Sequence, residues 1–246
     1  QVVQIDKPGL NDEELMQALP WQVKDLVSIA AEDILADYID LPAGSNQQTK
    51  INVVVASLSW LKQLTSMIDN LGLSVQSIQP EEWLARNLLG TGGQVAAADQ
   101  SGAVMLLTHV PGQELSLQIV KQGMVFFSRK LRGFNRLDQY DFAELQQGML
   151  DSLLLEVQRS LDYFEGQLRQ PPVKEILFVL ASPTVPAIVQ YFASNGFSKV
   201  RSVDFNRWLA AGQASAVTAT ELARYWPVLA GALELLQQEA SDETQS

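Results

Sequence analysis

The stretch LLTHVPGQELSLQIV, residues 106–120, contains the only histidine of this 246-residue chain. Its first apolar run ends at His109, Pro111 and Gly112 supply turn chemistry, and the residues after them alternate between apolar and polar. The stretch therefore predicts two antiparallel strands joined by a tight turn. A third strand is expected at 123–130, after a Lys-Gln-Gly turn, which extends the hairpin to a meander.

The rest of the chain indicates two mixed α/β lobes, because strand-sized apolar runs alternate with helical periodicities throughout. The small-residue stretch GTGGQVAAADQSG, residues 90–102, predicts a linker between the two lobes. We therefore expect one part at 1–89, a second at 103–236, and a polar, disordered tail at 237–246.

Several local patterns predict individual elements. Asn11 followed by Glu14 is a capping-box pattern that predicts the start of a helix. LSVQSIQ, residues 73–79, alternates as a strand would, after a helix expected at 59–71. A long helical periodicity predicts one continuous helix over 141–169.

The composition excludes several classes of function. A net charge of −11 and a pI near 4.5 argue against binding to nucleic acid or directly to anionic lipid, because like charges would repel. No apolar run reaches the roughly 20 residues that span a bilayer. The absence of cysteine excludes disulfides, thiol catalysis and thiolate metal sites, and we expect no metal. Because the chain begins with Gln1 rather than methionine, we expect a fragment or a processed piece of a longer protein.

His109 belongs to no recognisable catalytic motif. A Ser-His-Asp triad would have to combine it with Ser116 or Ser128, and the chain has no G-x-S-x-G sequence. No phosphate-binding glycine motif occurs, and the acidic cluster Asp12-Glu13-Glu14 is explained by the dipole of the helix it opens. We therefore predict no catalytic residues and interpret His109 as a structural imidazole. An unrelated α/β enzyme that uses paired carboxylates stays open as an alternative.

Five tryptophans lie near predicted helix starts or kinks, at positions 21, 60, 83, 208 and 226. Ordinary core or half-buried packing accounts for tryptophans in such places. The alternative is that some of them line a groove for a partner peptide, because aromatic anchors dominate such sites.

Four stretches occur in a characteristic order. They are QVVQIDKPGLNDEELMQALPWQVKDLVSI (1–29), AEDILADYIDLP (31–42), INVVVASLSWLKQLTSMIDNLGLSVQSIQPEEWLARNLL (51–89) and LLLEVQRSLDYFEGQL (153–168). Their order and spacing resemble the PilM-type actin-like proteins of type IV pilus assembly, above all the MshI branch from biogenesis of the mannose-sensitive haemagglutinin (MSHA) pilus. The resemblance covers nearly the whole chain at the level of motifs.

This resemblance implies a mixed α+β, actin-like fold of the ribonuclease H-like and FtsA-like type, in truncated form. Residues 1–89 would hold a small inserted α/β subdomain and part of the first lobe, and residues 103–236 a reduced second lobe. The family normally opens with a D-x-G-x-x-x-x-K hairpin, which would lie ahead of the position that corresponds to Gln1.

The resemblance also locates the nucleotide elements. The family's second phosphate hairpin aligns with 105–117, so its aspartate falls on His109 and its glycine on Pro111. A neutral imidazole cannot replace an aspartate near Mg²⁺, and proline removes an amide N–H and fixes φ. The glycines that the family places after the strand EILFVL are replaced by Ala181-Ser182-Pro183. We therefore expect these positions to be degenerate and to bind no nucleotide cofactor.

The resemblance implies a non-catalytic, cytoplasmic scaffold, peripheral to the bacterial inner membrane, in type IV (MSHA-type) pilus assembly. Its expected partner is the cytoplasmic N-terminal segment of a PilN-like bitopic membrane protein, with Trp21, Tyr38 and Trp60 as contacts. A pilus or secretion ATPase is a second expected partner. Two alternatives stay open: the cytoplasmic domain of a type II secretion L protein that docks the secretion ATPase, and a genuine ATP-binding actin-like ATPase.

Overall fold

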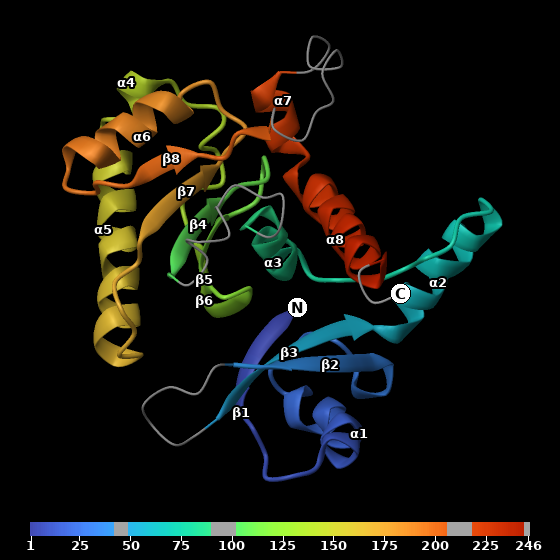
Figure 1. Ribbon diagram of the computed structural model, residues 1–246. Helices are drawn as coiled ribbons and strands as arrows, with labels where there is room; N and C mark the ends of the chain where they lie inside the picture. Colours follow the sequence, from blue (N-terminus) through green and yellow to red (C-terminus); the bar gives the residue numbers. More distant parts are fainter. Residues whose placement is uncertain (42–48, 90–101, 206–217, 244–246) are drawn as a thin grey trace. The chain divides into compact units, whose positions relative to one another are not determined.

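The computed structural model describes residues 1–41, 49–89, 102–205 and 218–243 (Figure 1). Contacts divide the chain into two compact units, Gln1–Pro80 and Glu81–Ser246. Each unit has its own sheet and its own buried core.

The boundary between the units falls after Pro80, ahead of the residue 89 expected from the sequence. The helical turns that follow it, α3 (Glu81–Leu84) and η2 (Ala85–Leu89), pack against α8 (Trp226–Glu243) of the second unit. The Asn87 amide donates to the Ala230 carbonyl at 3.1 Å, which fixes η2 to α8. Apart from Gly102, the predicted linker at 90–102 lies outside the described residues.

The first unit is built on an antiparallel sheet in the order β1-β3-β2. β3 is therefore the central strand, with a partner on each side. The elements in chain order are β1 (Val2–Asp6), α1 (Asp12–Val23), the 3₁₀ turn η1 (Ala31–Asp33), β2 (Ile34–Asp40), β3 (Lys50–Ser57) and α2 (Leu58–Asn70).

Helix α1 covers one face of this sheet. Asn11 accepts a hydrogen bond from the Glu14 backbone at 3.0 Å and the Glu14 carboxylate accepts one from the Asn11 backbone, so the predicted capping box is confirmed. Because strand side chains alternate between faces, every second residue of β3 points at the helix. The buried core of the unit comprises Leu15, Leu19, Val23, Ile34, Ala36, Ile51, Val53 and Val55.

The strand predicted at 73–79 does not form. Gly72 ends α2 with φ +72°, and the residues after it are in neither strand nor helix. A strand that follows a helix usually returns beside the strand before that helix. Both sides of β3 are already taken by β1 and β2, so that place is not available here.

The second unit has a five-stranded mixed sheet in the order β6-β5-β4-β7-β8. β4, β5 and β6 form the antiparallel meander predicted from the sequence, whereas β7 is parallel to both β4 and β8. The strands are β4 (Val104–Thr108), β5 (Leu115–Lys121), β6 (Met124–Leu131), β7 (Glu175–Val179) and β8 (Val200–Ser202).

The long helix predicted over 141–169 is broken in the structure. Gly148 has φ +101°, a left-handed conformation that ends one helical segment and begins the next. The segments are α4 (Phe142–Leu145), α5 (Met149–Asp162) and the π-helical turn η4 (Tyr163–Gln167); α6 (Val185–Ser194), α7 (Ala219–Arg224) and α8 follow later in the chain.

Helices α5 and α6 cover one face of the second sheet, and η2 and α8 lie on the other side of it (Figure 1). Leu107, Leu117 and Phe178 of the strands meet Leu153 and Val157 of α5 in one apolar core. On the other face, the Gln118 amide donates to the Glu82 carbonyl at 2.6 Å. The sheet is thus covered on both faces, as sheets with parallel strands require.

The disordered tail expected at 237–246 is not observed over most of its length. Helix α8 continues to Glu243, so most of that segment is helical. The sequence from 232 to 243 contains neither glycine nor proline and is rich in Leu, Gln, Glu and Ala, which are good helix formers.

Candidate functional site

His109 and the Ala181-Ser182-Pro183 turn lie at the same end of the second sheet. β4 and β7 are parallel and adjacent, with Thr108 opposite Val179, and both segments follow the carboxyl ends of these strands. The His109 backbone N–H donates to the Val179 carbonyl at 3.0 Å, which continues the ladder by one residue. In open α/β sheets this end of the strands is where ligands bind.

The turn after β4 is a type II turn. The Gln113 N–H donates to the Val110 carbonyl at 2.9 Å, with Pro111 and Gly112 between them. Gly112 has φ +84°, the conformation that the third position of this turn demands, and proline is favoured at the second. Pro111 thus stabilises the hairpin, although it removes an N–H from the position where the resemblance placed a glycine.

The His109 side chain is 1% exposed, and neither ring nitrogen has a hydrogen-bond partner among the described residues. Burial lowers the pKa of His109 below its ordinary 6.5, while the nearby backbone of Asn135 and the Asp138 carboxylate favour the protonated form and oppose that shift. Because burial is the largest effect, the imidazole is neutral at physiological pH. It offers no negative charge at the position of the family's aspartate.

The segment after β7 is filled by its own side chains. Ala181 and Ser182 are buried. The Ser182 hydroxyl accepts from the Thr184 N–H at 3.2 Å and shares a hydrogen bond with the Thr184 hydroxyl at 2.7 Å. Ser182 therefore organises the turn into α6, which begins at Val185. The structure brings the positions that the resemblance singled out to one end of the sheet, with local structural roles for Pro111 and Ser182.

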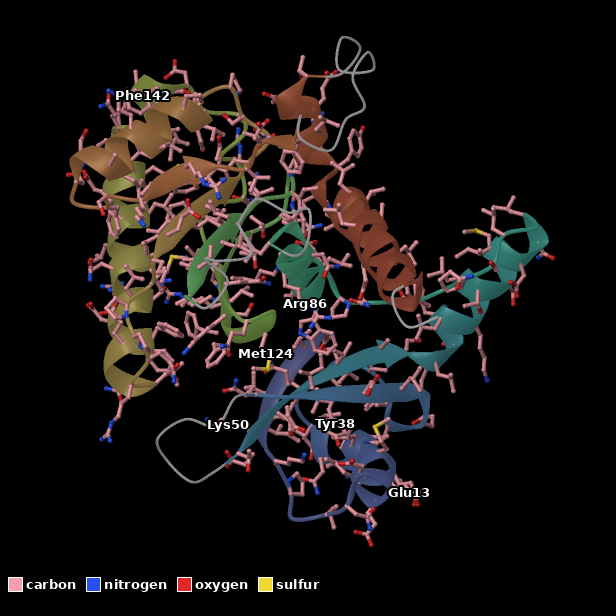
Figure 2. The ribbon with its side chains drawn as sticks, viewed as in Figure 1. Glu13, Tyr38, Lys50, Arg86, Met124 and Phe142 are labelled. Atoms are coloured by element: carbon pink, nitrogen blue, oxygen red, sulfur yellow. The ribbon has the colours of Figure 1, made fainter. Side chains whose placement is uncertain are left out.

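Two of the three predicted partner contacts are open to solvent. Trp21, near the end of α1, is 67% exposed, and Trp60, in the first turn of α2, is 57% exposed. Tyr38 is half-buried on the α1 side of the sheet, where its hydroxyl donates to Asp12 at 2.8 Å and the Lys7 amine lies over its ring (Figure 2).

These three side chains do not form one patch. Tyr38 contacts Asp12 at the start of α1, and Trp21 lies nine positions further along the helix, a rise of about 13.5 Å. Tyr38 pairs with Val53, whereas Trp60 lies beyond the end of β3. Sequence alone could not separate the two faces of β2, so it did not identify Tyr38 as a residue packed against the core.

Helix α2 carries an apolar stripe that was not predicted to be a surface. Trp60, Leu64, Met67 and Leu71 recur at intervals of three and four residues, and this spacing places them on one side of the helix. No residue of α2 is buried, and Figure 1 shows the helix running beyond the sheet rather than across its face. We call Trp60, Leu64, Met67 and Leu71 the α2 stripe. Its spacing was visible in the sequence, but such spacing normally marks a core face.

The residues after α2 add to this surface. Leu73 and Ile78 are 60% and 51% exposed. The backbone from 74 to 78 makes no hydrogen bond with another described residue. Exposed apolar side chains beside free backbone groups are the features by which a protein binds an extended or helical peptide.

No helix in the described part of the chain is long and apolar enough to cross a membrane. Within the same residues, no group of three or more acidic or histidine side chains is arranged to hold a metal ion.

Comparison with known proteins gives matches among solved structures. No protein-family model and no curated protein matches the sequence. A structure of the PilM–PilN type IV pilus biogenesis complex matches with a TM-score of 0.61 and 14% identity, over 95% of this chain and 75% of that chain. This chain has an actin-like fold. The expected fold class is thereby confirmed.

Two further solved structures match more distantly. The cytoplasmic domain of EpsL, an inner-membrane component of the Vibrio cholerae type II secretion system, has a TM-score of 0.41 and 11% identity over 93% of this chain and 70% of that one. The apo ParM protein of pSK41 has a TM-score of 0.36 and 11% identity over 85% of each chain. The actin-like fold of this chain thus rests on the PilM–PilN match.

Proposed function

We propose that this actin-like chain is a non-catalytic scaffold of type IV pilus assembly, of the MSHA type, on the cytoplasmic face of the inner membrane. It binds the cytoplasmic N-terminal segment of a PilN-like membrane protein. The proposal is supported by the fold that the chain shares with a PilM–PilN complex and by a free surface suited to a peptide.

The α2 stripe is the observation that carries the docking proposal. Trp60, Met67 and Leu71 of the stripe are more than half exposed, which is unfavourable unless a partner covers them. The exposed Leu73 and Ile78 and the free backbone of 74–78 extend the surface. A short segment that lies on the stripe would bury apolar area and pair with this backbone, and neither contact needs a catalytic residue.

The non-catalytic part of the proposal is supported by the end of the second sheet. The neutral, buried His109 cannot act as a carboxylate toward a hydrated Mg²⁺. Pro111 and the buried Ala181 and Ser182 replace glycines that would let the backbone approach a phosphate.

Fluorescence polarisation with a labelled N-terminal segment of a PilN-like protein tests the docking proposal. Met67→Glu places a charge in the centre of the α2 stripe and should weaken binding at least about tenfold. The matched control is Met124→Glu, which changes the same residue type at an exposed position of the second unit and should leave the affinity unchanged (Figure 2). Equal effects of the two variants would refute the α2 stripe as the site.

A second pair of variants separates the two exposed tryptophans. Trp60→Ala should weaken binding, because this ring belongs to the α2 stripe. Trp21→Ala removes an even more exposed ring outside the stripe and should have little effect. If only Trp21→Ala weakened binding, the docking surface would have to be placed on α1.

The rival functions are tested in parallel. A pull-down that recovered a secretion ATPase domain and not the PilN-like segment would favour the type II secretion assignment. Calorimetry with Mg-ATP should give no heat of binding, and micromolar binding would overturn the non-catalytic proposal.

A further inference from the structure

A groove of about 910 Å³ lies within the second unit, where the end of β6 meets the starts of α4 and α5. Leu131 and Phe134 form its buried floor, and Tyr140 and Met149 are half-buried in its wall. The groove thus offers an apolar contact surface on elements other than those of the α2 stripe.

The charged side chains of the groove include a cation that has no ion pair with a described residue. Arg129, Lys130 and Arg132 line it together with Glu144 and Glu156. Both carboxylates are already engaged. Glu156 binds Arg129 at 2.6 Å and Arg159 at 2.7 Å, and Glu144 accepts the Asp141 N–H at 2.8 Å in a capping box. Lys130 is engaged as well, because its amine lies 3.6 Å from Glu81 and 3.4 Å from Glu82. Arg132 is therefore the cation of the groove without an ion pair among the described residues, and it favours an acidic ligand.

Several hydrogen-bond donors in the groove have no acceptor. The Nε atom of Arg129 is buried without a partner, and a buried unpaired donor costs about 1–3 kcal/mol unless an acceptor reaches it. Arg132 is exposed and makes no ion pair with a described residue. Gly148 is the N-cap residue of helix α5 and has no side chain to cap the first N–H groups. A carboxylate placed here would accept hydrogen bonds from these donors.

The backbone along the groove is also free on one side. β5 is the only neighbour of β6 among the described strands, so β6 is an edge of the sheet. An edge strand presents alternate N–H and C=O groups to an incoming strand. The half of β6 that carries Arg129 and Lys130 borders the groove, so a ligand that lies in it can pair with this edge.

We propose that this groove binds an extended, acidic segment of a partner protein, which adds as a strand to the free edge of β6. One of its carboxylates bonds to Arg129, Arg132 and the start of α5, and an adjacent apolar side chain packs on Tyr140 and Met149. The site differs from the proposed PilN-like docking surface in position and in ligand charge, so the chain has two separate binding surfaces.

Amide NMR titration of the whole chain with defined peptides tests this proposal. The probe is an acetylated hexapeptide of alternating valine and glutamate, and the matched control has glutamine in place of every glutamate. The acidic peptide should shift the amide signals of β6 and of the start of α5 and should bind about tenfold more tightly than the glutamine peptide. Binding should weaken when the salt concentration rises from about 0.05 M to about 0.5 M.

Two changes locate the contacts. Arg132→Glu should lower the affinity for the acidic peptide at least about tenfold, whereas Arg224→Glu, the same change on exposed α7, should not. A peptide with alternate amides N-methylated cannot pair as a strand and should also lose binding. The proposal is overturned if neither peptide binds at millimolar concentration, if the two bind equally, or if Arg132→Glu has no effect. Undiminished binding of the methylated peptide would refute strand addition.

Discussion

Helices α2 and α5 are almost equal in length, 13 and 14 residues, and each carries an apolar stripe. α5 buries Leu150, Leu153 and Val157 against the second sheet and begins at a glycine that provides no side-chain cap. α2 has no fully buried residue, and its start is fixed by several polar contacts. The Ser57 hydroxyl accepts the Trp60 N–H at 3.1 Å, and the Asp33 carboxylate accepts the Ser59 N–H at 2.7 Å.

This difference between α2 and α5 shows which interactions stabilise each helix. Burial of a stripe stabilises a helix through tertiary packing, which makes a cap dispensable in α5. In α2 the local contacts of Ser57 and Asp33 position a helix whose apolar side stays available. A helix that is fixed at its start and keeps Trp60, Met67 and Leu71 exposed is suited to receive a partner.

The largest expected effect is the loss of packing in α5. Leu153→Ala should lower the free energy of unfolding of the second unit by about 2–5 kcal/mol, because a fully buried side chain leaves a cavity. Met67→Ala on the α2 stripe should change the stability of the first unit by no more than about 0.5 kcal/mol. Urea titration followed by the amide signals of each unit measures both. Similar losses would show that α2 is packed in solution.

A smaller effect is expected at the start of α2. Ser57→Ala removes the hydroxyl that caps the helix and should lower the free energy of opening α2 by about 0.5–2 kcal/mol. Amide hydrogen exchange across α2 reports this directly. The control is Ser152→Ala in α5, where the hydroxyl only donates to the Gly148 carbonyl and exchange should change little. Equal changes in both helices would contradict the assigned role of the cap.

The smallest effect is a pH dependence confined to the second unit, which contains the only histidine. Burial lowers the pKa of His109, so between that value and 6.5 the unfolded state binds more protons than the folded state. The stability of this unit therefore falls as the pH drops below about 6.5, by at most about 1.4 kcal/mol per pH unit, and levels off below the lowered pKa.

His109→Gln should remove this dependence. Thermal unfolding at about pH 7.5 and about pH 5.5 compares the two proteins, and the wild type should lose more stability than the variant. An unchanged pH dependence in the variant would assign the proton to another group.

Patterns that depend on local contacts were predicted correctly from the sequence. The capping box at Asn11 and Glu14 and the turn at Pro111-Gly112 each close within four residues, so the local sequence is sufficient to specify them. The break at Gly148 was missed because a helical stripe continues across it, and only the left-handed φ of that glycine shows the interruption.

Features that depend on distant partners were harder to predict. The alternation at 73–79 is typical of a strand, but no sequence window reveals that both sides of β3 are taken. The α2 stripe was visible as a periodicity, while its exposure depends on what the rest of the unit covers. Tyr38 was expected at a partner surface. The register of β2 with β3 instead places its side chain on the face of the sheet that packs against the core, where its hydroxyl donates to Asp12.

The central position of β3 also has a consequence for synthesis. β1 leaves the ribosome before β3, and the first residue of β3 to be made, Lys50, pairs with Asp6 at the end of β1. The β4–β5 hairpin, by contrast, closes as soon as its short turn has been made. β1 must therefore wait without its partner while roughly forty residues are translated, and a ribosomal pause ahead of Ser57 would prolong the period in which its edge can pair wrongly.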